Sequence, residues 1–447
     1  MTYPSFLRVA VTALFLLAVT SAFAKHKGAP DSPVSIEQFG AQAGNPNFDN
    51  GPIIIKALQS AKSVLFPANK NYYISSTISV TGLDGVTITA TGSTITNTNY
   101  DVQTLHFVKC SNITINGGHY TRDVMPDKQD GKNQHTIEFV SCANVSITYA
   151  HIERSPEMGI ANNVVNGGVY TNNTIEHCMR DGIYAHYSIN LKYIDNTITD
   201  IKDDGLSMHD YGIPVQKSMI IQAGHPQAGY SVISGNHVSN CVEGVASIGC
   251  THLTISNNTI KNTVDAGISL FNSEDLSPGS NARLSFITVV NNTIDNAGAN
   301  LTVDGVFFKS TAKYIVGRSA IYIACVKQGQ PYYLSKLRSS DINVQGNRVS
   351  NCPVNGATLY NIDGLVLRDN QFTNCHSDNN ADTGDIVEIQ NCTAINVSDN
   401  EVIDTRRPAL HDRGYAIVNC SGTFKQGVVN GFKVEAVSIK NSPGLTH

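Results

Sequence analysis

The sequence predicts an all-β protein, a right-handed parallel β-helix, and three observations carry this prediction. A short motif, Asn followed by Thr-Ile or a close variant, recurs along the chain, and the shortest steps between copies are 22 or 23 residues. Asn, Thr, Ser, Ile, Val and Gly dominate the composition, which favours β-strands over helices. Asn-Gly pairs that would close β-hairpins are too few for a β-sandwich. The aligned copies start at Asn173, Asn196, Asn236, Asn258, Asn292, Asn347, Asn370 and Asn400.

Residues 253–271 illustrate one repeat. Two short alternating strands are separated by Asn257 and Asn258, and a third strand, 267–271, follows after a brief turn. Three short strands in about 22 residues describe one coil of a parallel β-helix, whose strands pair with the coils on either side. Asn is suited to the left-handed corner of such a coil and to hydrogen-bonded ladders between coils.

The first 24 residues are predicted to be a signal peptide. Arg8 supplies the positive charge, residues 9–19 form the apolar stretch, and Ala22-Phe23-Ala24 is a small-x-small cleavage site. We therefore expect cleavage after Ala24 and a secreted or periplasmic protein. A membrane anchor is the alternative, but the apolar stretch is too short to span a bilayer and no second stretch of spanning length follows.

The domain boundaries follow the repeat. A linker at 25–33 is expected to precede the β-helix, which we place at 34–405, and residues 406–447 lose the repeat and are predicted to form a C-terminal cap. An amphipathic helix over 51–61 is predicted to cap the other end of the coil stack. Loops added at one corner of a stack are expected to wall a groove. Such insertions interrupt the period at 211–231, 272–285, 306–340 and 376–384.

Charge and cysteine usage exclude some partners. The formal net charge of −5 gives no sign of nucleic-acid binding. The ten cysteines of an exported chain suggest disulfides, yet most of them fall in phase with the repeat, which is typical of stacked, buried small residues, so few disulfides or none are expected. No cysteine has zinc-ligand spacing, no metal or cofactor is predicted, and the oligomeric state stays open. One phase holds Cys178, Cys241, Cys352 and Cys375, and the other holds Cys110, Cys142, Cys250, Cys392 and Cys420.

Acidic residues recur at one position of the third strand. Asp181, Asp204 and Glu243 are predicted to form a ladder across adjacent coils, about 4.8 Å apart, with Asp203 and Asp265 beside it. Like charges this close raise the pKa of at least one member, and a protonated acid beside an ionised carboxylate is what glycosidic cleavage needs. The alternative is that Asp-Gly pairs serve only as corners of the coil.

Other polar residues are predicted to bind substrate near this ladder. His186 and His209 lie in phase, five residues after Asp181 and Asp204, and we expect a structural or substrate-binding role for them. A metal site formed with Asp210 is the less favoured alternative. The remaining candidates are Arg180, Tyr184, Lys202, Asp210 and Asp265.

Two motifs carry a resemblance to a known family. Asp181-Gly182, followed 22–23 residues later by Asp203-Asp204, resembles the catalytic motifs of polygalacturonase-like glycoside hydrolases in the pectin-lyase-like β-helix superfamily. The resemblance implies hydrolysis with inversion, in which Asp204 protonates the leaving oxygen and Asp181 and Asp203 activate water.

The sequence departs from that family at two places. Glu243 stands where the family has His, and Ser269 and Phe271 stand where it has the cations that hold a galacturonate carboxylate. These departures argue against polygalacturonate as the substrate.

Three functions remain open from the sequence. The first is a glycoside hydrolase acting on a polysaccharide. The second is a lyase or C5-epimerase acting on a uronate polymer, for which Arg180 and Lys202 would neutralise the substrate carboxylate. The third is a β-helix that binds glycans without turnover. For the hydrolase, the carboxylate ladder predicts a bell-shaped pH profile whose upper limb moves to lower pH in Glu243→Gln.

Overall fold

The structure is a computed structural model that describes residues 32–125, 133–218, 225–311, 319–327, 337–377, 385–408, 410–411 and 413–446. The expected signal peptide and almost all of the expected linker lie outside the described residues. Residues 33–447 form one compact unit. No helix in the described part of the chain is both long enough and apolar enough to cross a membrane.

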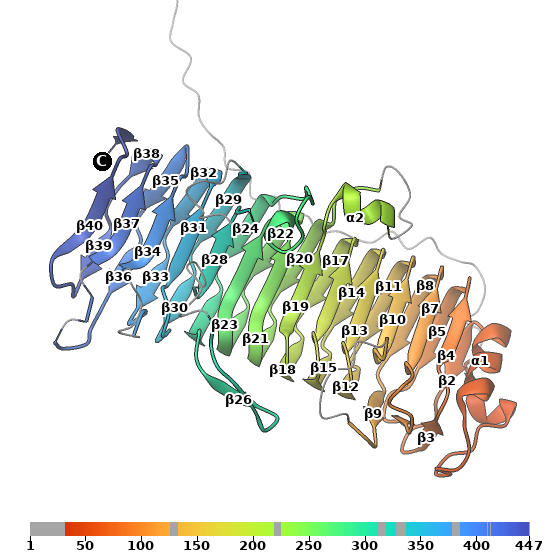
Figure 1. Ribbon diagram of the computed structural model, residues 1–447. Coiled ribbons are helices and arrows are strands. Elements are labelled where there is room, and N and C mark those ends of the chain that lie inside the picture. The colour runs from red at the N-terminus through yellow and green to blue at the C-terminus, as the bar shows by residue number, and fades with distance from the viewer. Residues whose placement is uncertain are drawn as a thin grey trace, which may run out of the picture. The chain divides into compact units, whose positions relative to one another are not determined.

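The described chain forms the expected right-handed parallel β-helix, with three strands in each coil (Figure 1). One coil consists of β17 (Ile189–Ile194), β18 (Thr197–Ile201) and β19 (Asp204–His209), which define the first, second and third faces. The next coil pairs with it in parallel through β20 (Gly229–Ser234) and β21 (His237–Ile248), and β21 covers the second and third faces without a break. Apolar side chains that point inward from all three faces fill one continuous core.

The remaining strands follow the same order. The first face contains β1 (Val34–Ser35), β2 (Ser63–Leu65), β5 (Asp84–Thr89), β8 (Ser111–Asn116), β11 (Ala143–Thr148), β14 (Asn166–Thr171), β22 (Thr251–Ser256), β24 (Ser285–Val290), β29 (Ser339–Gln345), β32 (Ile362–Arg368), β35 (Ile395–Ser398), β38 (Ser421–Phe424) and β41 (Gly444–Thr446). The second contains β3 (Asn71–Ile74), β6 (Thr94–Asn97), β9 (His119–Arg122), β12 (His151–Ser155), β15 (Thr174–Cys178), the start of β23 (Thr259–Phe271), β25 (Thr293–Ala297), β30 (Arg348–Ser350), β33 (Gln371–Thr373), β36 (Glu401–Ile403) and β39 (Val428–Asn430). The third contains β4 (Ile78–Thr81), β7 (Leu105–Val108), β10 (Ile137–Val140), β13 (Ile160–Asn163), β16 (Ile183–His186), the end of β23, β28 (Ile321–Ala324), β31 (Ala357–Tyr360), β34 (Asp385–Gln390), β37 (Arg413–Val418) and β40 (Glu435–Lys440).

An asparagine ladder joins the coils at the corner between the first and second faces, as predicted. In each step the side-chain oxygen of one Asn accepts from both the backbone N–H and the side-chain amide of the Asn before it, as in Asn236 to Asn258 at 2.9 Å. All eight aligned Asn residues from Asn173 to Asn400 take part. The left-handed backbone lies at the residue before each ladder Asn, for example at Asn257 with φ 55°. One residue therefore turns the chain, and the next forms the hydrogen bonds of the ladder.

The cysteines occupy the two phases that the repeat predicts. All ten are buried free thiols. In one column the side chains of Cys352 and Cys375 contact each other, and in the other the backbone N–H of Cys110 lies 3.3 Å from the sulfur of Cys142. Each thiol fills a small space in the core, which is the packing role expected of an in-phase cysteine.

The two ends of the coil stack differ from each other. At the N-terminal end, η1 (Ile36–Phe39) and α1 (Gly51–Ser60) lie beside the first strands, and α1 buries Ile54, Ala57 and Leu58, as expected of a cap. At the other end the expectation of a repeat-free cap from residue 406 is corrected, because parallel strands continue to Thr446. The sequence signal fades there because β39 is mostly exposed and lacks an inward apolar pattern.

The insertions lie at the corners of the coils. The first contains α2 (Ile213–Ser218), and the second contains η2 (Ser273–Asp275), both after third-face strands. The predicted insertion at 306–340 is corrected, because it includes the core strand β28. An antiparallel hairpin of β26 (Leu301–Val303) and β27 (Val306–Phe308) precedes β28 and projects from the second-face side (Figure 1). The insertion at 376–384 lies almost entirely outside the described residues.

Candidate active site at the start of the third face

The predicted carboxylate ladder is present in register. Asp204 pairs directly with Glu243 of the next coil. The N–H of Gly182 donates to the carbonyl of Asp204 at 3.0 Å, which places Asp181 one coil before Asp204. Asp265 lies off this column, because a register shift between β21 and β23 pairs Glu243 with Ala266.

A column of glycines follows the acidic residues for a packing reason. A Cβ on Gly182 would lie 2.6 Å from the carbonyl oxygen of Gly205 and 2.7 Å from a methyl carbon of Ile198. The same crowding occurs at Gly205 and Gly244, and none of these glycines has a left-handed backbone. The glycine of each Asp-Gly pair is therefore explained by close packing at the corner, whereas the acid before it is not.

Asp181 is the most buried member of the ladder. Asp181 is 1% exposed. The hydroxyl of Ser207 donates a hydrogen bond to Oδ2 of Asp181, and Oδ1 of Asp181 is buried without a hydrogen-bond partner. Burial, reinforced by the nearby Asp203 carboxylate, raises the pKa of Asp181 to about 7, although Ser207 and Arg180 oppose the rise. A carboxyl group with this pKa holds a proton in mildly acidic solution.

Asp203 belongs to a charged row beside the ladder. Nε of Arg180 lies 3.6 Å from Oδ2 of Asp203, and another guanidinium nitrogen lies 3.8 Å from Oε2 of Glu157. Partial burial raises the pKa of Asp203, and Arg180 opposes this rise. The side chain of Asp203 is 42% exposed, so solvent screening limits the rise. Glu157 was missed by sequence reasoning, although it stands one coil before Arg180 in the same repeat.

Aromatic rings and neutral histidines cover the third face next to these acids. The Tyr184 ring lies edge-on to His209 with centroids 5.1 Å apart, and Tyr211 lies edge-on to His186 at 5.3 Å. Burial lowers the pKa of His186 to about 4 and that of His209 to about 3, so both rings are neutral near pH 7. Nε2 of His209 is 3.8 Å from Oδ2 of Asp204, which brings this ring into the site. Tyr211 has no counterpart in the repeat that could have revealed it.

Three residues that were predicted to bind substrate instead contact other groups of the protein. The carboxylate of Asp210 accepts from the N–H groups of Gly212 and Ala228 at 2.7 and 2.6 Å, which closes the corner after β19. Asp265 accepts from the backbone N–H and hydroxyl of Thr311. Nζ of Lys202 lies 3.3 Å from the sulfur of Met179.

The metal alternative for the histidines is not supported. Within the part of the chain that the structure describes, His186, His209 and Asp210 do not bring their ligand atoms together as a metal-binding group. Asp210 instead lines a cavity of about 210 Å³ beside the first insertion, with Gly212, Ile213, His225, Gln227, Asn281 and Ala282. Residues of the first two insertions thus line one concave surface at the far end of β19.

Comparison with known proteins identifies the fold. The sequence matches no protein-family model and no curated protein. The catalytic unit of a GH87 α-1,3-glucanase from Streptomyces thermodiastaticus is similar in structure, with a TM-score of 0.51, 14% identity, and coverage of 94% of this chain and 70% of that chain. The surface adhesin PfbA of Streptococcus pneumoniae has a TM-score of 0.56, 10% identity, and coverage of 93% and 99%. A tailspike protein of Escherichia coli bacteriophage HK620, in complex with a pentasaccharide, has a TM-score of 0.52, 11% identity, and coverage of 92% and 78%.

These similarities confirm the fold that the sequence resemblance implied. All three neighbours are right-handed parallel β-helix proteins, as this chain is. At such low identities the likeness concerns the fold alone. The finer resemblance to polygalacturonase-like hydrolases rests on the Asp181, Asp203 and Asp204 motifs and stays a prediction.

Proposed function

We propose that this chain is a glycoside hydrolase that uses the carboxyl groups of Asp181, Asp203 and Asp204 to cleave a polysaccharide. The observation that carries the proposal is Asp181, whose pKa of about 7 is set by burial and by the Asp203 carboxylate. A buried acid that keeps its proton beside a second, partly exposed carboxylate is the pairing that glycosidic cleavage uses. The likeness to an α-1,3-glucanase is compatible with this chemistry on the same fold.

The proposal assigns the proton to Asp181. At pH 5–6 this carboxyl is protonated and can protonate the glycosidic oxygen, while Asp203 acts as the ionised base that activates water. This differs from the family pattern, which gives the acid role to Asp204. Asp204, close to His209, then stabilises the positive charge that develops on the sugar.

Cleavage requires the site to open around Asp181, because this residue is only 1% exposed. Arg180 is the side chain best placed to move. It is long, 35% exposed and held by carboxylates at 3.6 and 3.8 Å, so it can turn toward solvent without repacking the core. Binding of a sugar would supply the energy for this movement.

The site favours a neutral polysaccharide over a polyuronate. Ser269 and Phe271, at the positions of the family cations, are both buried. Arg180 already shares its charge between Glu157 and Asp203. A uronate carboxylate would meet several acidic groups, so electrostatic repulsion disfavours it. This arrangement also weakens the lyase or epimerase alternative, which needs a cation to neutralise that carboxylate.

The second candidate is a β-helix that binds glycans without turnover. The observation that favours it is the burial of the ladder, since Asp204 and Glu243 are also no more than 8% exposed. The tailspike and adhesin neighbours are compatible with such a role on this fold.

One assay separates these functions. The purified protein is incubated with α-glucans, β-glucans, polygalacturonate and alginate, and both reducing ends and ultraviolet absorbance of unsaturated products are followed. Reducing ends without absorbance support hydrolysis, absorbance supports a lyase, and binding without either product supports the glycan-binding alternative. A uronate epimerase, which releases no ends, is detected by NMR of the treated polymer.

Variants test whether the named carboxyl groups carry the activity. Asp181→Asn and Asp203→Asn should each lower the turnover number by at least about a hundredfold. The matched control is Asp200→Asn, because Asp200 has the same left-handed backbone as Asn240, Asn262 and Asn296 at its position in later coils. Full activity in Asp181→Asn would remove the assignment.

Export is part of the same proposal. The signal-peptide pattern in residues 1–24 supports it, as does the likeness in fold to the surface protein PfbA. N-terminal sequencing of the protein recovered outside the cytoplasm should begin at Lys25, and a chain that retains residues 1–24 would contradict cleavage after Ala24.

A further inference from the structure

A group of metal-ligating side chains lies on the second face. His119 begins β9, and His151 pairs with it in register at the start of β12. Glu153 lies two residues after His151 and therefore points from the same side of the strand. The ligand atoms of these three residues all lie within 4.8 Å of one another.

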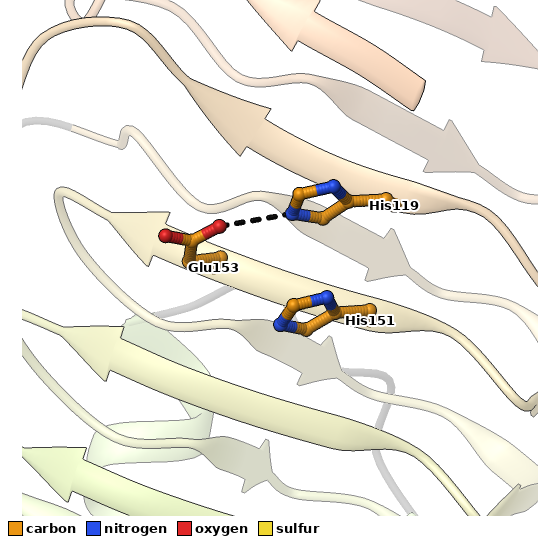
Figure 2. A group of neighbouring side chains, drawn as sticks. All are labelled: His119, His151 and Glu153. Atoms are coloured by element: carbon orange, nitrogen blue, oxygen red, sulfur yellow. Dashed lines mark hydrogen bonds and ion pairs between the residues drawn. The ribbon is translucent and has the colours of Figure 1, made fainter. Parts of the chain in front are cut away.

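The two imidazole rings are oriented alike. They stack with centroids 4.3 Å apart and an interplanar angle of 7°. Figure 2 shows the rings one above the other, with the Glu153 carboxylate beside their edges and bonded to His119. Nε2 of His119 lies 2.9 Å from this carboxylate, and Nε2 of His151 lies 2.6 Å from Glu176 of the next coil. Both ring nitrogens thus face carboxylate oxygens on the outer surface.

From this geometry we propose that His119, His151 and Glu153 bind a divalent transition-metal ion, for which Zn²⁺ is the representative. Two imidazoles and one carboxylate form the ligand set of zinc sites that keep an open position. Imidazole nitrogens select ions of this class over Ca²⁺ and Mg²⁺, which prefer oxygen ligands. The ion takes the place of the proton between Nε2 of His119 and Glu153, and Nε2 of His151 exchanges its contact with Glu176 for a bond to the ion.

The site can adjust to tetrahedral coordination. Bonds of about 2.0 Å from the ion to its ligands place the ligand atoms about 3.3 Å apart. The ring nitrogens must therefore move about 1 Å closer together, by a shift or a tilt of the rings. His119 and His151 are 33% and 39% exposed, and Glu153 is 27% exposed, so this movement does not disturb the core. Solvent supplies the fourth ligand, and the ion fastens two adjacent coils of the second face.

A second group in the described chain offers an internal comparison. His177, Asp200 and Asp304 also bring their ligand atoms together, and Nδ1 of His177 lies 2.6 Å from Oδ1 of Asp304 on the β26–β27 turn. This group has one imidazole, so it is expected to be the weaker and less selective of the two for Zn²⁺.

The test uses zinc chloride and the full mature chain without an affinity tag, stripped of metal beforehand. Calorimetric titration should show a Zn²⁺ site that weakens by about tenfold or more in His119→Ala, His151→Ala and Glu153→Gln. The matched control is His237→Ala, because His237 lies exposed in the same column of the second face and pairs with Thr197 and Thr259 rather than with another His. Zn²⁺ should also raise the melting temperature of the wild type but not of His151→Ala.

Other outcomes would overturn the proposal. Equal Zn²⁺ affinity in the wild type and in His119→Ala, or no measurable Zn²⁺ binding, excludes the site. Loss of binding in Asp304→Asn but not in His151→Ala would place the ion at the hairpin instead. Equally strong binding of Ca²⁺ that is unaffected by either His→Ala change would show that carboxylates alone attract cations.

Discussion

The hydroxyl of Ser207 donates a hydrogen bond to the carboxylate of Asp181, and this bond joins two adjacent coils of the third face. It is a local interaction that lowers the pKa of Asp181, but burial and Asp203 outweigh it. The balance leaves a carboxyl group at the edge of β16 that is protonated over a wide pH range. The first two predictions follow from this balance.

Asp181 should make stability depend on pH. Its folded pKa of about 7 lies above the ordinary value of 3.8, so its contribution is complete below about pH 4 and is lost as pH rises through about 7. The free energy of unfolding should therefore fall across this window, by at most about 4 kcal/mol for this group. Urea unfolding from pH 4 to pH 8 measures it, and Asp181→Asn should lose this part of the slope. An unchanged slope in that variant would show that Asp181 ionises normally.

Charges near Asp181 should move its titration in opposite directions. Arg180→Gln removes a cation that lowers the pKa of Asp181, so that pKa should rise. Glu243→Gln removes an acidic side chain two coils from Asp181, beyond Asp204, so the pKa of Asp181 should fall. Carbon NMR of the Asp181 carboxyl group measures both shifts without requiring activity, and in an active enzyme the upper limb of the pH profile should follow. An unchanged pKa of Asp181 in Glu243→Gln would show that Glu243 is not electrostatically linked to Asp181.

The asparagine ladder should contribute strongly to stability. Asn258→Ala removes the acceptor for two donors of Asn236 and the donor to the carbonyl of Ile233. Buried polar groups left without partners cost about 1–3 kcal/mol each, so we expect a loss of about 3 kcal/mol in the free energy of unfolding. Thr259→Ala, at the partly exposed next position, is the control and should cost less than about 1 kcal/mol. Similar losses in both variants would argue against a special role for the ladder.

The cysteines should be free of disulfides but shielded from thiol reagents in the native chain. Because all ten thiols are buried in the core, a thiol reagent should react slowly with the native chain and should modify ten groups after unfolding in guanidinium. Counting modified groups by mass spectrometry under non-reducing conditions tests this. Fewer than ten modified groups would reveal a disulfide that the structure does not contain.

Much of the fold could be predicted because a parallel β-helix is nearly one-dimensional. Each coil contacts mainly its neighbours, so a period in the sequence becomes a column in space. Asn236 and Asn258 illustrate this rule, as does the pairing of Asp204 with Glu243. The rule failed where the pattern was interrupted, at the strand β28 inside an apparent insertion and in the strands beyond residue 406.

The sequence by itself determined which residues share a column, and therefore the fold, the cysteine packing and the carboxylate ladder. Only the tertiary structure decided how deep each side chain lies and what it contacts. Asp181 and Asp204 hold the same position in the repeat, yet Asp181 is 1% exposed and Asp204 is 8% exposed. Burial and the Asp203 carboxylate raise the pKa of Asp181. Depth depends on atoms contributed by neighbouring coils and insertions, and periodicity contains no information about them. For the same reason the contacts of Arg180 with Glu157, and of His119 with Glu153, emerged only when the coils were stacked.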